Sequence, residues 1–532
     1  MDNKEFNLLY EKWIWVRKHD NHMEKWSLLE VFKRAPEASE LAGELPTQNV
    51  VVLRLLLAVM HAIFTVRNIK GNESRITTWQ EAYMRWKELW ELNGFPFEVI
   101  EKYLKEYEER FWLFHPEFPF YQIADIGKST EYSAGKLIGE LSESSNKIRL
   151  FASRAGEAKN RVSYDEAARW LLYVNAFDDT SAKPVKKGLP SPGAGWLGQL
   201  GLIYAEGHNL FETLLLNFIL VDEGEIFGDS NPDAKAYWER NDCRIEEREN
   251  IRIPESQKEL LTIQSRRLQL KKENGKVIGY KLLGGDFFSK ENVFIEQMTL
   301  WRRDDKKSVF LPKRHRRDKQ VWRDFAALLV AGAGQDGRRP GVVRWVAGLK
   351  DAGLYEGKKV KFHITGIQYG DKDFFADDII EDSLQMNAEV LKDIEEAGEG
   401  WSNEIIKMLE LTDKAASWLG WLASSIAVAE GRAFKERDSA KRKIQEFAKE
   451  QGYQKLDEEF RDWLLSINPH EDSMGNKMLE WKNKSKDILL VEGKHLLEKS
   501  SEKAMIGIIK NGEIYSSVKA FQIFRRKLNT IL

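Results

Sequence analysis

Proline almost disappears from the chain after about residue 377, and this change separates two stretches of different character. Pro469 is the only one of the 13 prolines that follows this point. Because proline breaks the interior of a helix, its absence there permits long helices. Apolar residues recur at helical spacing over the segments 403–430, 434–451, 456–465, 477–500 and 513–528. Four to five amphipathic helices with short connections predict an antiparallel four-helix bundle.

The stretch before residue 377 combines helical and strand-like patterns. Helical periodicity covers 78–92, 96–111, 164–176 and 211–220. Alternation predicts strands at 268–270, 277–283, 287–298 and 360–368, with Asn274-Gly275 as a hairpin turn. The predicted fold class is α+β and mostly helical. It has a large mixed N-terminal domain with short antiparallel strands over residues 1–380, and a C-terminal four-helix bundle over residues 381–532.

The chain is nearly neutral, which limits how it can meet nucleic acid. Its 532 residues include 82 basic and 84 acidic side chains, giving a net charge of −2, and 42% of them are hydrophobic. This composition is typical of a folded chain with two or three domains. Any contact with nucleic acid therefore requires a local patch. Cys243 is the only cysteine, which excludes an internal disulfide and indicates a reducing, cytoplasmic compartment.

The most apolar run, Val50 to Val66, predicts a buried helix and no membrane partner. It is 17 residues long and includes Arg54 and His61, whereas a membrane span needs about 20 mostly apolar residues. Arg54 and His61 lie seven residues apart and share one face of a helix. We expect a core helix with one polar stripe, capped by Thr47.

The stretch from Arg302 to Lys319 is a local basic patch. It holds nine cations against three acids, including the residues Lys313, Arg314, Arg316 and Arg317. Such a patch suits phosphate contacts, since neutralised phosphates release counterions; a solvated surface loop is the alternative. The segment 183–195 joins three lysines to several glycines, which let a backbone approach a nucleic-acid strand closely. A plain surface loop explains that segment equally well.

Complete catalytic motifs are missing from the sequence. The segment Ile126 to Thr130 ends like a phosphate-binding loop, but Gln122 stands where its first glycine is required. The acid pairs at 377–378 and 381–382 have the chemistry of metal ligands, although carboxylates at a helix start also complement the helix dipole. We therefore predict no metal and no cofactor. Two alternatives to a binding function stay open: a metal-dependent nuclease or RNA-processing enzyme using Asp377 or Asp378, and a helical scaffold that binds only protein.

Several motifs spread along the chain resemble one known family. They begin with Phe6-Asn7-Leu8-Leu9-Tyr10-Glu11-Lys12-Trp13-Ile14-Trp15-Val16 and continue at 27–32, 45–48, 114–122, 195–201, 206–207, 210–217, 264–268 and 296–302. In this order they resemble CasA, the large subunit of the type I-E CRISPR surveillance complex called Cascade. The family architecture, a large mixed domain followed by a four-helix bundle, agrees with the change near residue 380.

The resemblance implies a non-catalytic subunit of an RNA-guided complex. Proteins of this family recognise the protospacer-adjacent motif in double-stranded target DNA, help to separate the strands and dock the helicase-nuclease. The implied partners are the other Cascade subunits, the 5′ handle of the guide RNA, the target DNA and the helicase-nuclease. The guide reads the sequence by base pairing, while the protein reads only a short motif, as in other guided effectors.

The resemblance also implies particular site residues. DNA contacts map to Lys290, to a glycine-rich loop with Lys186, Lys187, Gly188, Gly193 and Gly195, and to a hairpin with Gly370, Asp371, Lys372 and Asp373. A mobile loop maps to 146–162, with Phe151, Ser153 and Arg154. The strand-separating wedge of the family usually carries glutamine, which is missing from Tyr369 to Phe374. Lys372, Asp373 and Phe374 are the alternative wedges, of which the carboxylate is unfavourable near phosphates.

Overall fold

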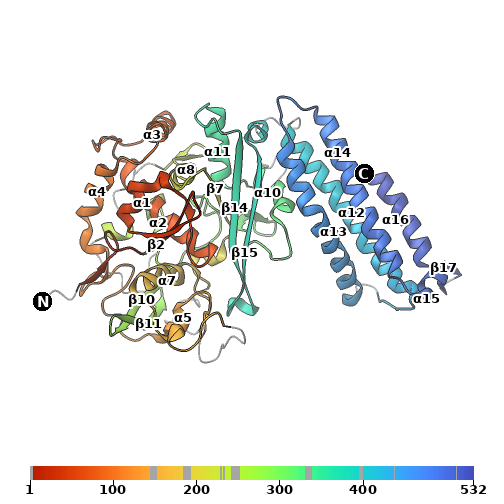
Figure 1. The fold of residues 1–532 in the computed structure, drawn as a ribbon, viewed down its shortest axis with the longest axis horizontal. Coiled ribbons are helices and arrows are strands. Elements are labelled where there is room, and N and C mark those ends of the chain that lie inside the picture. Colours follow the sequence, from red (N-terminus) through yellow and green to blue (C-terminus); the bar gives the residue numbers. More distant parts are fainter. Residues whose placement is uncertain are drawn as a thin grey trace. The chain divides into compact units, whose positions relative to one another are not determined.

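The computed structural model describes residues 4–143, 152–181, 183, 193–227, 231, 234–240, 252–329, 338–394, 400–435, 438–510 and 512–532. The chain forms two units, and it passes between them more than once (Figure 1). Unit 1 comprises Met1–Arg317, Gly334–Tyr355 and Lys361–Ser383; unit 2 comprises Asp318–Ala333, Glu356–Val360 and Leu384–Leu532. The division at residue 380 made from the sequence stays a prediction. The α+β, mostly helical fold class is confirmed.

Unit 1 contains small antiparallel sheets rather than one large sheet. Their strand orders are β1-β5, β3-β2-β4, β10-β11-β6, β12-β13, β8-β9 and β15-β14-β7. The strands are β1 (Glu5–Asn7), β2 (Ile14–Lys18), β3 (Met23–Trp26), β4 (Ala38–Leu41), β5 (Trp112–Phe114), β6 (Thr130–Ser133), β7 (Leu202–Glu206), β8 (Val221–Asp222), β9 (Glu225–Ile226), β10 (Arg266–Glu273), β11 (Lys276–Gly284), β12 (Trp301–Asp304), β13 (Val309–Pro312), β14 (Lys359–Tyr369) and β15 (Ala376–Asn387).

The strand predictions are partly confirmed. Strands β10 and β11 pair through a turn in which Asn274 and Gly275 both have positive φ, as a two-residue hairpin requires. Strand β14 covers the predicted 360–368 and pairs with β7. The predicted strand at 287–298 is wrong, because that segment is loop and turn. The basic stretch is also not a plain loop, since β12 and β13 form a hairpin within it.

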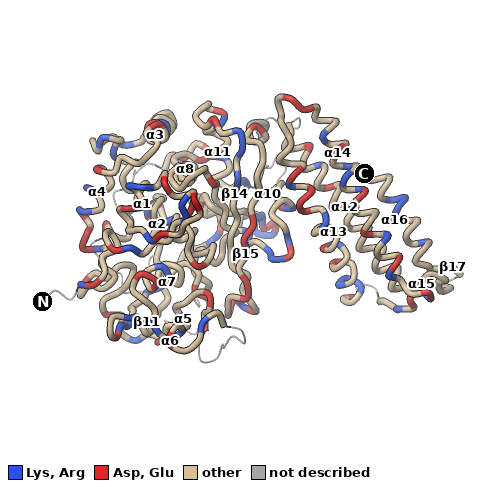
Figure 2. The backbone as a smooth tube through the Cα atoms, viewed as in Figure 1, with Lys and Arg blue, Asp and Glu red and all other residues tan. Residues whose placement is uncertain are grey.

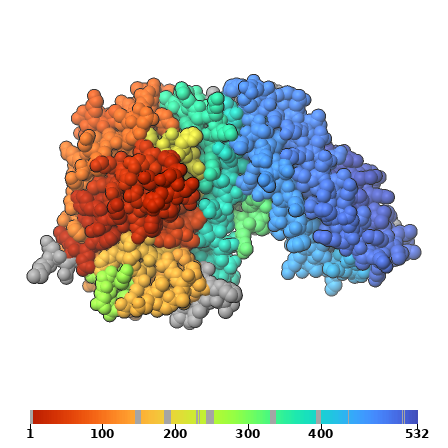
Figure 3. Space-filling model, viewed as in Figure 1, coloured from red at the N-terminus to blue at the C-terminus, as the bar shows by residue number. Residues whose placement is uncertain are grey.

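Short helices surround these sheets in unit 1. They are α1 (Leu28–Arg34), α2 (Pro46–Phe64), α3 (Trp79–Glu91), α4 (Phe97–Glu106), α5 (Ala134–Leu137), α6 (Glu157–Asn160), α7 (Tyr164–Phe177), α8 (Leu210–Leu216), α9 (Gln257–Leu261) and α11 (Gly341–Asp351). Segments distant in sequence lie side by side: α8 packs against β4 and the short helix Ala35–Glu37, so its yellow surface adjoins the red N-terminal surface in Figure 3.

Helix α2 is the core helix that the apolar run predicts. By length and composition it could cross a membrane, yet 94% of its most apolar stretch is buried inside the protein. Arg54 and His61 are both buried in it. Burial lowers the pKa of His61 to about 3, so the imidazole is neutral. The expected Thr47 cap is wrong: the helix begins at Pro46, and Leu45 occupies the cap position without a side-chain hydrogen bond.

Arg54 of α2 forms a buried ion pair with Glu296. Its Nη1 and Nη2 atoms donate to the two carboxylate oxygens at 2.8 and 3.0 Å. Trp196 Nε1 donates to the same carboxylate at 2.8 Å, and the backbone amide of Met298 donates at 3.2 Å. The polar stripe of α2 is thus joined to the end of the glycine-rich segment.

Unit 2 is dominated by long helices. These are α12 (Trp401–Ala429), α13 (Ser439–Ser466), α14 (Met474–Glu498) and α16 (Ser517–Ile531), with the short α10 (Phe325–Leu329) and α15 (Glu502–Ile506). Helix α12 packs against α13, α14 and α16. The helices predicted at 434–451 and 456–465 are one helix, α13. The last helix begins at Ser517 instead of residue 513, since β16 (Ile508–Lys510) and β17 (Glu513–Tyr515) form a hairpin before it.

Charged residues of both signs are interspersed along the backbone of both units (Figure 2). This agrees with the net charge of −2. The electrostatics of any site are therefore decided locally, by the groups within a few ångströms of it.

We expect Glu296→Ala to lower the free energy of unfolding by about 3–5 kcal/mol, because it leaves the Arg54 charge buried without its partner. Urea unfolding followed by tryptophan fluorescence measures this. The matched control is Glu291→Ala, whose carboxylate pairs with Lys307 at 2.8 Å on the surface, and we expect a loss below about 1 kcal/mol there. Equal losses in the two variants would contradict the assignment.

Candidate nucleic-acid interface

The β14–β15 hairpin ends in a tip with an unfavourable backbone. Lys372 and Asp373 have φ values of 54° and 57°, a left-handed conformation that costs non-glycine residues roughly 1–2 kcal/mol each. The amide of Gly370 donates to the carbonyl of Phe375 at 2.9 Å and closes the turn. A Cβ atom on Gly370 would lie 2.3 Å from the Phe375 ring, so a side chain there would displace that exposed ring. Lys372, Phe374 and Phe375 are exposed at the tip.

Contacts from outside the hairpin hold this tip in place. Arg314 donates from Nη1 and Nη2 to the two carboxylate oxygens of Asp373, both at 2.8 Å. Thr180 donates from Oγ1 to the carbonyl of Lys372 at 2.9 Å and from its amide to the carbonyl of Asp373 at 3.0 Å. A strained backbone conformation persists where surrounding contacts hold it in place. The hydrogen bonds from Arg314 and Thr180 are such contacts.

Lys290 lies beside this tip. Partial burial and the nearby Arg314 and Arg302 guanidinium groups lower the pKa of Lys290, while the Asp373 carboxylate acts in the opposite direction. These influences place Lys290, Arg314 and Asp373, which the sequence analysis selected separately, in one neighbourhood. Lys290 therefore lies within electrostatic range of the Arg314–Asp373 ion pair.

The basic patch is divided by its structure. Arg317 is exposed and pairs with Asp378 at 2.9 Å, and Arg316 is exposed. Arg314 lies 5.2 Å from the ring centre of Tyr369, whose hydroxyl donates to the carbonyl of Phe177 at 2.6 Å. Lys313 contributes its backbone, which lies against Gly201: a Cβ atom there would be 2.0 Å from the Lys313 carbonyl oxygen.

The described part of the glycine-rich loop packs tightly. A Cβ atom on Gly195 would lie 2.3 Å from the carbonyl oxygen of Ala176, at the end of α7. The amide of Gly195 donates to the carbonyl of Asp178 at 2.9 Å. Gly193 has ordinary space around it, since a Cβ atom there would lie 3.5 Å from Gln199 Nε2. Lys186, Lys187 and Gly188 lie outside the described residues.

A buried ionic cluster secures both ends of that loop. Asp178 pairs with Lys183 at 2.7 Å and with Arg266 at 2.6 Å, while Lys136 pairs with Asp179 at 2.6 Å. Arg266 Nη2 also donates to the carbonyl of Gly193 at 2.7 Å. Lys183 and Gly193 flank the intervening segment, so one cluster fixes the chain on either side of it.

The cluster shifts the ionisation of its members. Burial alone would raise the pKa of Asp178, but Lys183, Arg266 and Lys136 together hold it well below its usual range. Burial lowers the pKa of Lys183 to about 8, with Asp178 opposing the shift. Asp178 is therefore ionised wherever the protein is folded at neutral pH.

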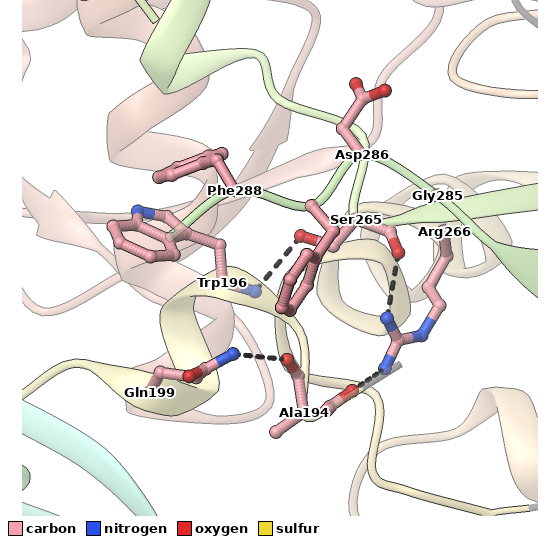
Figure 4. A pocket seen from close by; sticks show the side chains of 10 residues that line it. Ala194, Trp196, Gln199, Ser265, Arg266, Gly285, Asp286 and Phe288 are labelled. Atoms are coloured by element: carbon pink, nitrogen blue, oxygen red, sulfur yellow. Dashed lines mark hydrogen bonds between the residues drawn. The ribbon is translucent and has the colours of Figure 1, made fainter. Parts of the chain in front are cut away.

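A small pocket lies beside this cluster (Figure 4). Its volume is about 20 Å³, room for roughly one water molecule. Trp196 and Phe288 form one wall with ring centres 4.5 Å apart, and the Trp196 amide donates to Ser265 Oγ at 3.0 Å. Such a pocket has room for a solvent molecule and is too small for a nucleotide or cofactor.

The predicted mobile loop is only partly described, and Phe151 lies outside the described residues. Ser153 Oγ donates to Glu140 at 2.7 Å, and Arg154 pairs with Glu140 at 2.8 Å and with Glu166. These contacts join the loop to the start of α7. Among the described contacts, neither residue reaches Lys290 or the hairpin tip.

The acids considered as metal ligands do not converge. Asp378 pairs with Arg317 and accepts the amide of Ile379 at 2.9 Å. Asp377 and Glu381 are exposed on β15, a strand and not a helix start, so the helix-dipole explanation for them is wrong. Within the described ranges, groups of three or more His, Cys, Asp or Glu side chains placed to hold a metal are absent.

Sequence reasoning missed several residues that build this site. Thr180 and Asp178 support the tip and the loop through hydrogen bonds and ion pairs between segments far apart in sequence. The only sequence signal was Gln264 to Leu268, noticed as a motif, which contains Arg266. Spacing along the chain gives no information about such long-range partners.

Comparison with known proteins agrees with this architecture. The family model described as CRISPR-associated protein Cse1 matches residues 7–491. The CRISPR-associated protein CasA/Cse1 of Thermus thermophilus is 30% identical over 337 residues, which span 62% of this chain and 62% of that protein.

Solved structures share the fold over nearly the whole chain. Thermobifida fusca Cse1 has 30% identity and a TM-score of 0.85, covering 100% of this chain and 98% of that one. Acidimicrobium ferrooxidans Cse1 has 24% identity and a TM-score of 0.75, covering 99% and 98%. A chain of a CRISPR RNA-guided surveillance complex has 16% identity and a TM-score of 0.67, covering 98% and 99%.

A mixed unit of small antiparallel sheets and a bundle of long helices are thus features that this chain shares with a CRISPR-associated protein of solved structure. The chain belongs to the Cse1 family. The resemblance to CasA that the sequence motifs indicated is confirmed.

We expect Gly195→Ala to lower the free energy of unfolding by about 1–3 kcal/mol, because the added methyl group collides with the Ala176 carbonyl. Gly193→Ala is the matched control two residues away, and its added methyl group meets only ordinary contacts. Urea unfolding compares the two. A Gly193 variant as unstable as the Gly195 variant would show that the close approach to α7 is not the cause.

The Asp178 cluster predicts a specific acid sensitivity. The unfolded carboxyl titrates near pH 3.9 and the folded one lower, so the unfolded state binds the proton first as pH falls. The stability from this group is complete above about pH 5 and is lost progressively as pH falls below about 4 toward the lower folded pKa. In Asp178→Asn, urea unfolding between about pH 3.5 and 6 is expected to vary less with pH than in the unmodified chain. Asp125→Asn, at an exposed position, is the control; if Asp178→Asn and the unmodified chain have parallel pH profiles, the cluster is not the source.

Proposed function

We propose that this chain is the DNA-recognition subunit of a type I-E CRISPR Cascade complex. The carrying observation is the convergence of Lys290, the hairpin tip and Arg314 of the basic patch in one neighbourhood of unit 1. Membership of the Cse1 family supports the proposal, as does the shared fold with a chain of an RNA-guided surveillance complex. The subunit recognises the protospacer-adjacent motif, starts strand separation and docks the helicase-nuclease in the cytoplasm.

Lys290 and the glycine-rich loop are the proposed contacts to the motif. The Lys290 ammonium, near the Arg314 and Arg302 guanidinium groups, suits a phosphate or a minor-groove acceptor. The minor groove presents a degenerate pattern, so few contacts there give a permissive reading. Arg266 donates to the carbonyl of Gly193, so the described end of the loop at Gly193–Gly195 is held without a bulky side chain of its own.

The proposed wedge is formed by Lys372 and Phe374 rather than Asp373. The Asp373 carboxylate is occupied by Arg314, whose charge offsets its repulsion of phosphates. Lys372 and Phe374 are exposed next to it. A lysine attracts the phosphate backbone of DNA, while an aromatic ring stacks on a base. The stacking contact contributes about 1–3 kcal/mol per base.

The partners of the proposed subunit are the other Cascade subunits, the 5′ handle of the guide RNA, the duplex target and the helicase-nuclease. The proposed role is binding rather than catalysis. The nuclease alternative predicts magnesium-dependent cleavage by the purified chain that is lost in Asp377→Ala or Asp378→Ala. The scaffold alternative predicts no dependence on nucleic acid.

The test is target binding by a reconstituted Cascade with and without this chain, on duplexes whose bases flanking the protospacer are randomised. Binding to a particular flanking motif that requires the chain is the expected result and also reveals the motif. Binding that is indifferent to the chain would overturn the proposal.

Lys290→Glu and Lys372→Glu are each expected to weaken target capture by about tenfold and to reduce its salt dependence by about one phosphate contact. Filter binding at several salt concentrations measures both quantities. Lys276→Glu is the matched control, an exposed lysine at the start of β11. Unchanged capture in both Lys290 and Lys372 variants would remove these residues from the interface.

A further inference from the structure

A groove of about 320 Å³ lies between α12 and α16 in unit 2. On α12 it is lined by Trp421, Ser424, Ser425 and Val428, which follow the i, i+3, i+4, i+7 spacing of one helical face. On α16 the lining residues Lys519, Ala520 and Ile523 repeat part of that spacing. Two parallel ridges of helical side chains with a furrow between them are the surface against which a further helix packs.

The serine hydroxyls in the floor of this α12–α16 groove are already hydrogen-bonded within the protein and need no partner from an occupant. Ser424 and Ser425 donate their hydroxyls to the carbonyl of Trp421 at 3.0 and 2.8 Å. Gln445 donates to Ser424 Oγ at 3.1 Å. Small side chains whose hydrogen bonds are already made allow a second helix to approach closely without desolvation cost.

Exposed apolar side chains extend the groove on one side. Ile509 and Ile514 are directly opposite each other in the β16–β17 hairpin, so they share a face, and they are 78% and 56% exposed. Ile514 also lines the groove. Trp421 is only half-buried, although its helix belongs to the bundle. Contiguous exposed apolar surface next to a furrow indicates a protein interface.

The charge around the groove selects the occupant. The charged residues that line it are Lys441 of α13 and Lys519 of α16. The neighbouring groove between α12, α13 and α14 adds Arg432, Lys443 and Lys499 against one acid, Glu430. An apolar furrow with a cationic rim is complementary to an apolar stripe flanked by acids.

We propose that the α12–α16 groove binds an acidic amphipathic helix of a protein partner, which packs as an additional helix on the bundle. The docking proposal rests on the proposed function in one respect: the partner is taken to belong to the Cascade assembly. A nucleic-acid strand fits less well: Trp421 and Tyr515 offer aromatic faces, but Lys441 and Lys519 are the two cations that line the groove, too few to follow a phosphate backbone. A second copy of this chain would present the same cations and repel the rim.

A photo-crosslinking residue at Ile514 of the full chain tests the proposal in the reconstituted complex with the helicase-nuclease added. Irradiation is expected to join Ile514 to an acidic, helical segment of another protein subunit. Ser425→Trp fills the furrow and is expected to abolish that product. Lys441→Glu with Lys519→Glu is expected to weaken binding of the crosslinked partner by at least about tenfold.

The matched control is Lys455→Glu with Lys494→Glu, which changes the net charge equally at exposed positions of α13 and α14 that line neither groove. Circular dichroism confirms that each variant is folded. Crosslinking to nucleic acid, or no crosslink in an intact complex, overturns the docking proposal. Motif-dependent DNA capture by the same complexes reports separately on the proposed function, so the two failures are distinguishable.

Discussion

The Glu296 carboxylate is the contact on which the organisation of unit 1 depends. It accepts hydrogen bonds from Arg54 in α2, from Trp196 at the end of the glycine-rich segment and from the amide of Met298. The carbonyl of Met298 in turn accepts the amide of Ile203 in β7. A buried ion pair contributes little net stability over an apolar alternative. Its directional hydrogen bonds fix the positions of the core helix, the loop and the sheet relative to one another.

The glycines of the segment Gly195 to Gly201, near this carboxylate, allow close approach of other parts of the chain. Gly195, Gly198 and Gly201 each lie where a Cβ atom would come within 2.3 Å of another group: the Ala176 carbonyl, the Tyr369 hydroxyl and the Lys313 carbonyl. These three neighbours belong to α7, the β14–β15 hairpin and the basic patch. The glycines therefore bring the parts of the candidate interface together, and Arg266 with Asp178 secures the loop from the other side.

Patterns of local sequence predicted the parts of the fold that are governed by local forces, and long-range partners account for the rest. The long helices of unit 2, the buried α2 and the Asn274-Gly275 hairpin follow from periodicity and turn chemistry. Apolar residues at 287–298 alternate like a strand, yet no neighbouring strand pairs with them in the described chain, so they form loop. Trp418 and Trp421 have the helical spacing of core positions but are only partly buried, and Lys527 of α16 lies over the Trp418 ring. The candidate site was likewise predictable only as separate pieces: charge or resemblance selected Lys290, Arg314 and Asp373 one by one. That Arg314 neutralises Asp373 depends on a hairpin returning toward a preceding loop, which periodicity cannot reveal.

The pairing of Arg314 with Asp373 makes the shape of the hairpin tip conditional on charge. Two left-handed residues are kept in place partly by a guanidinium that an incoming phosphate would also attract. A phosphate bound by Arg314 would compete with Asp373 for the guanidinium and would repel the carboxylate it displaces. The restraint that Arg314 places on the tip is therefore one that an anion would weaken.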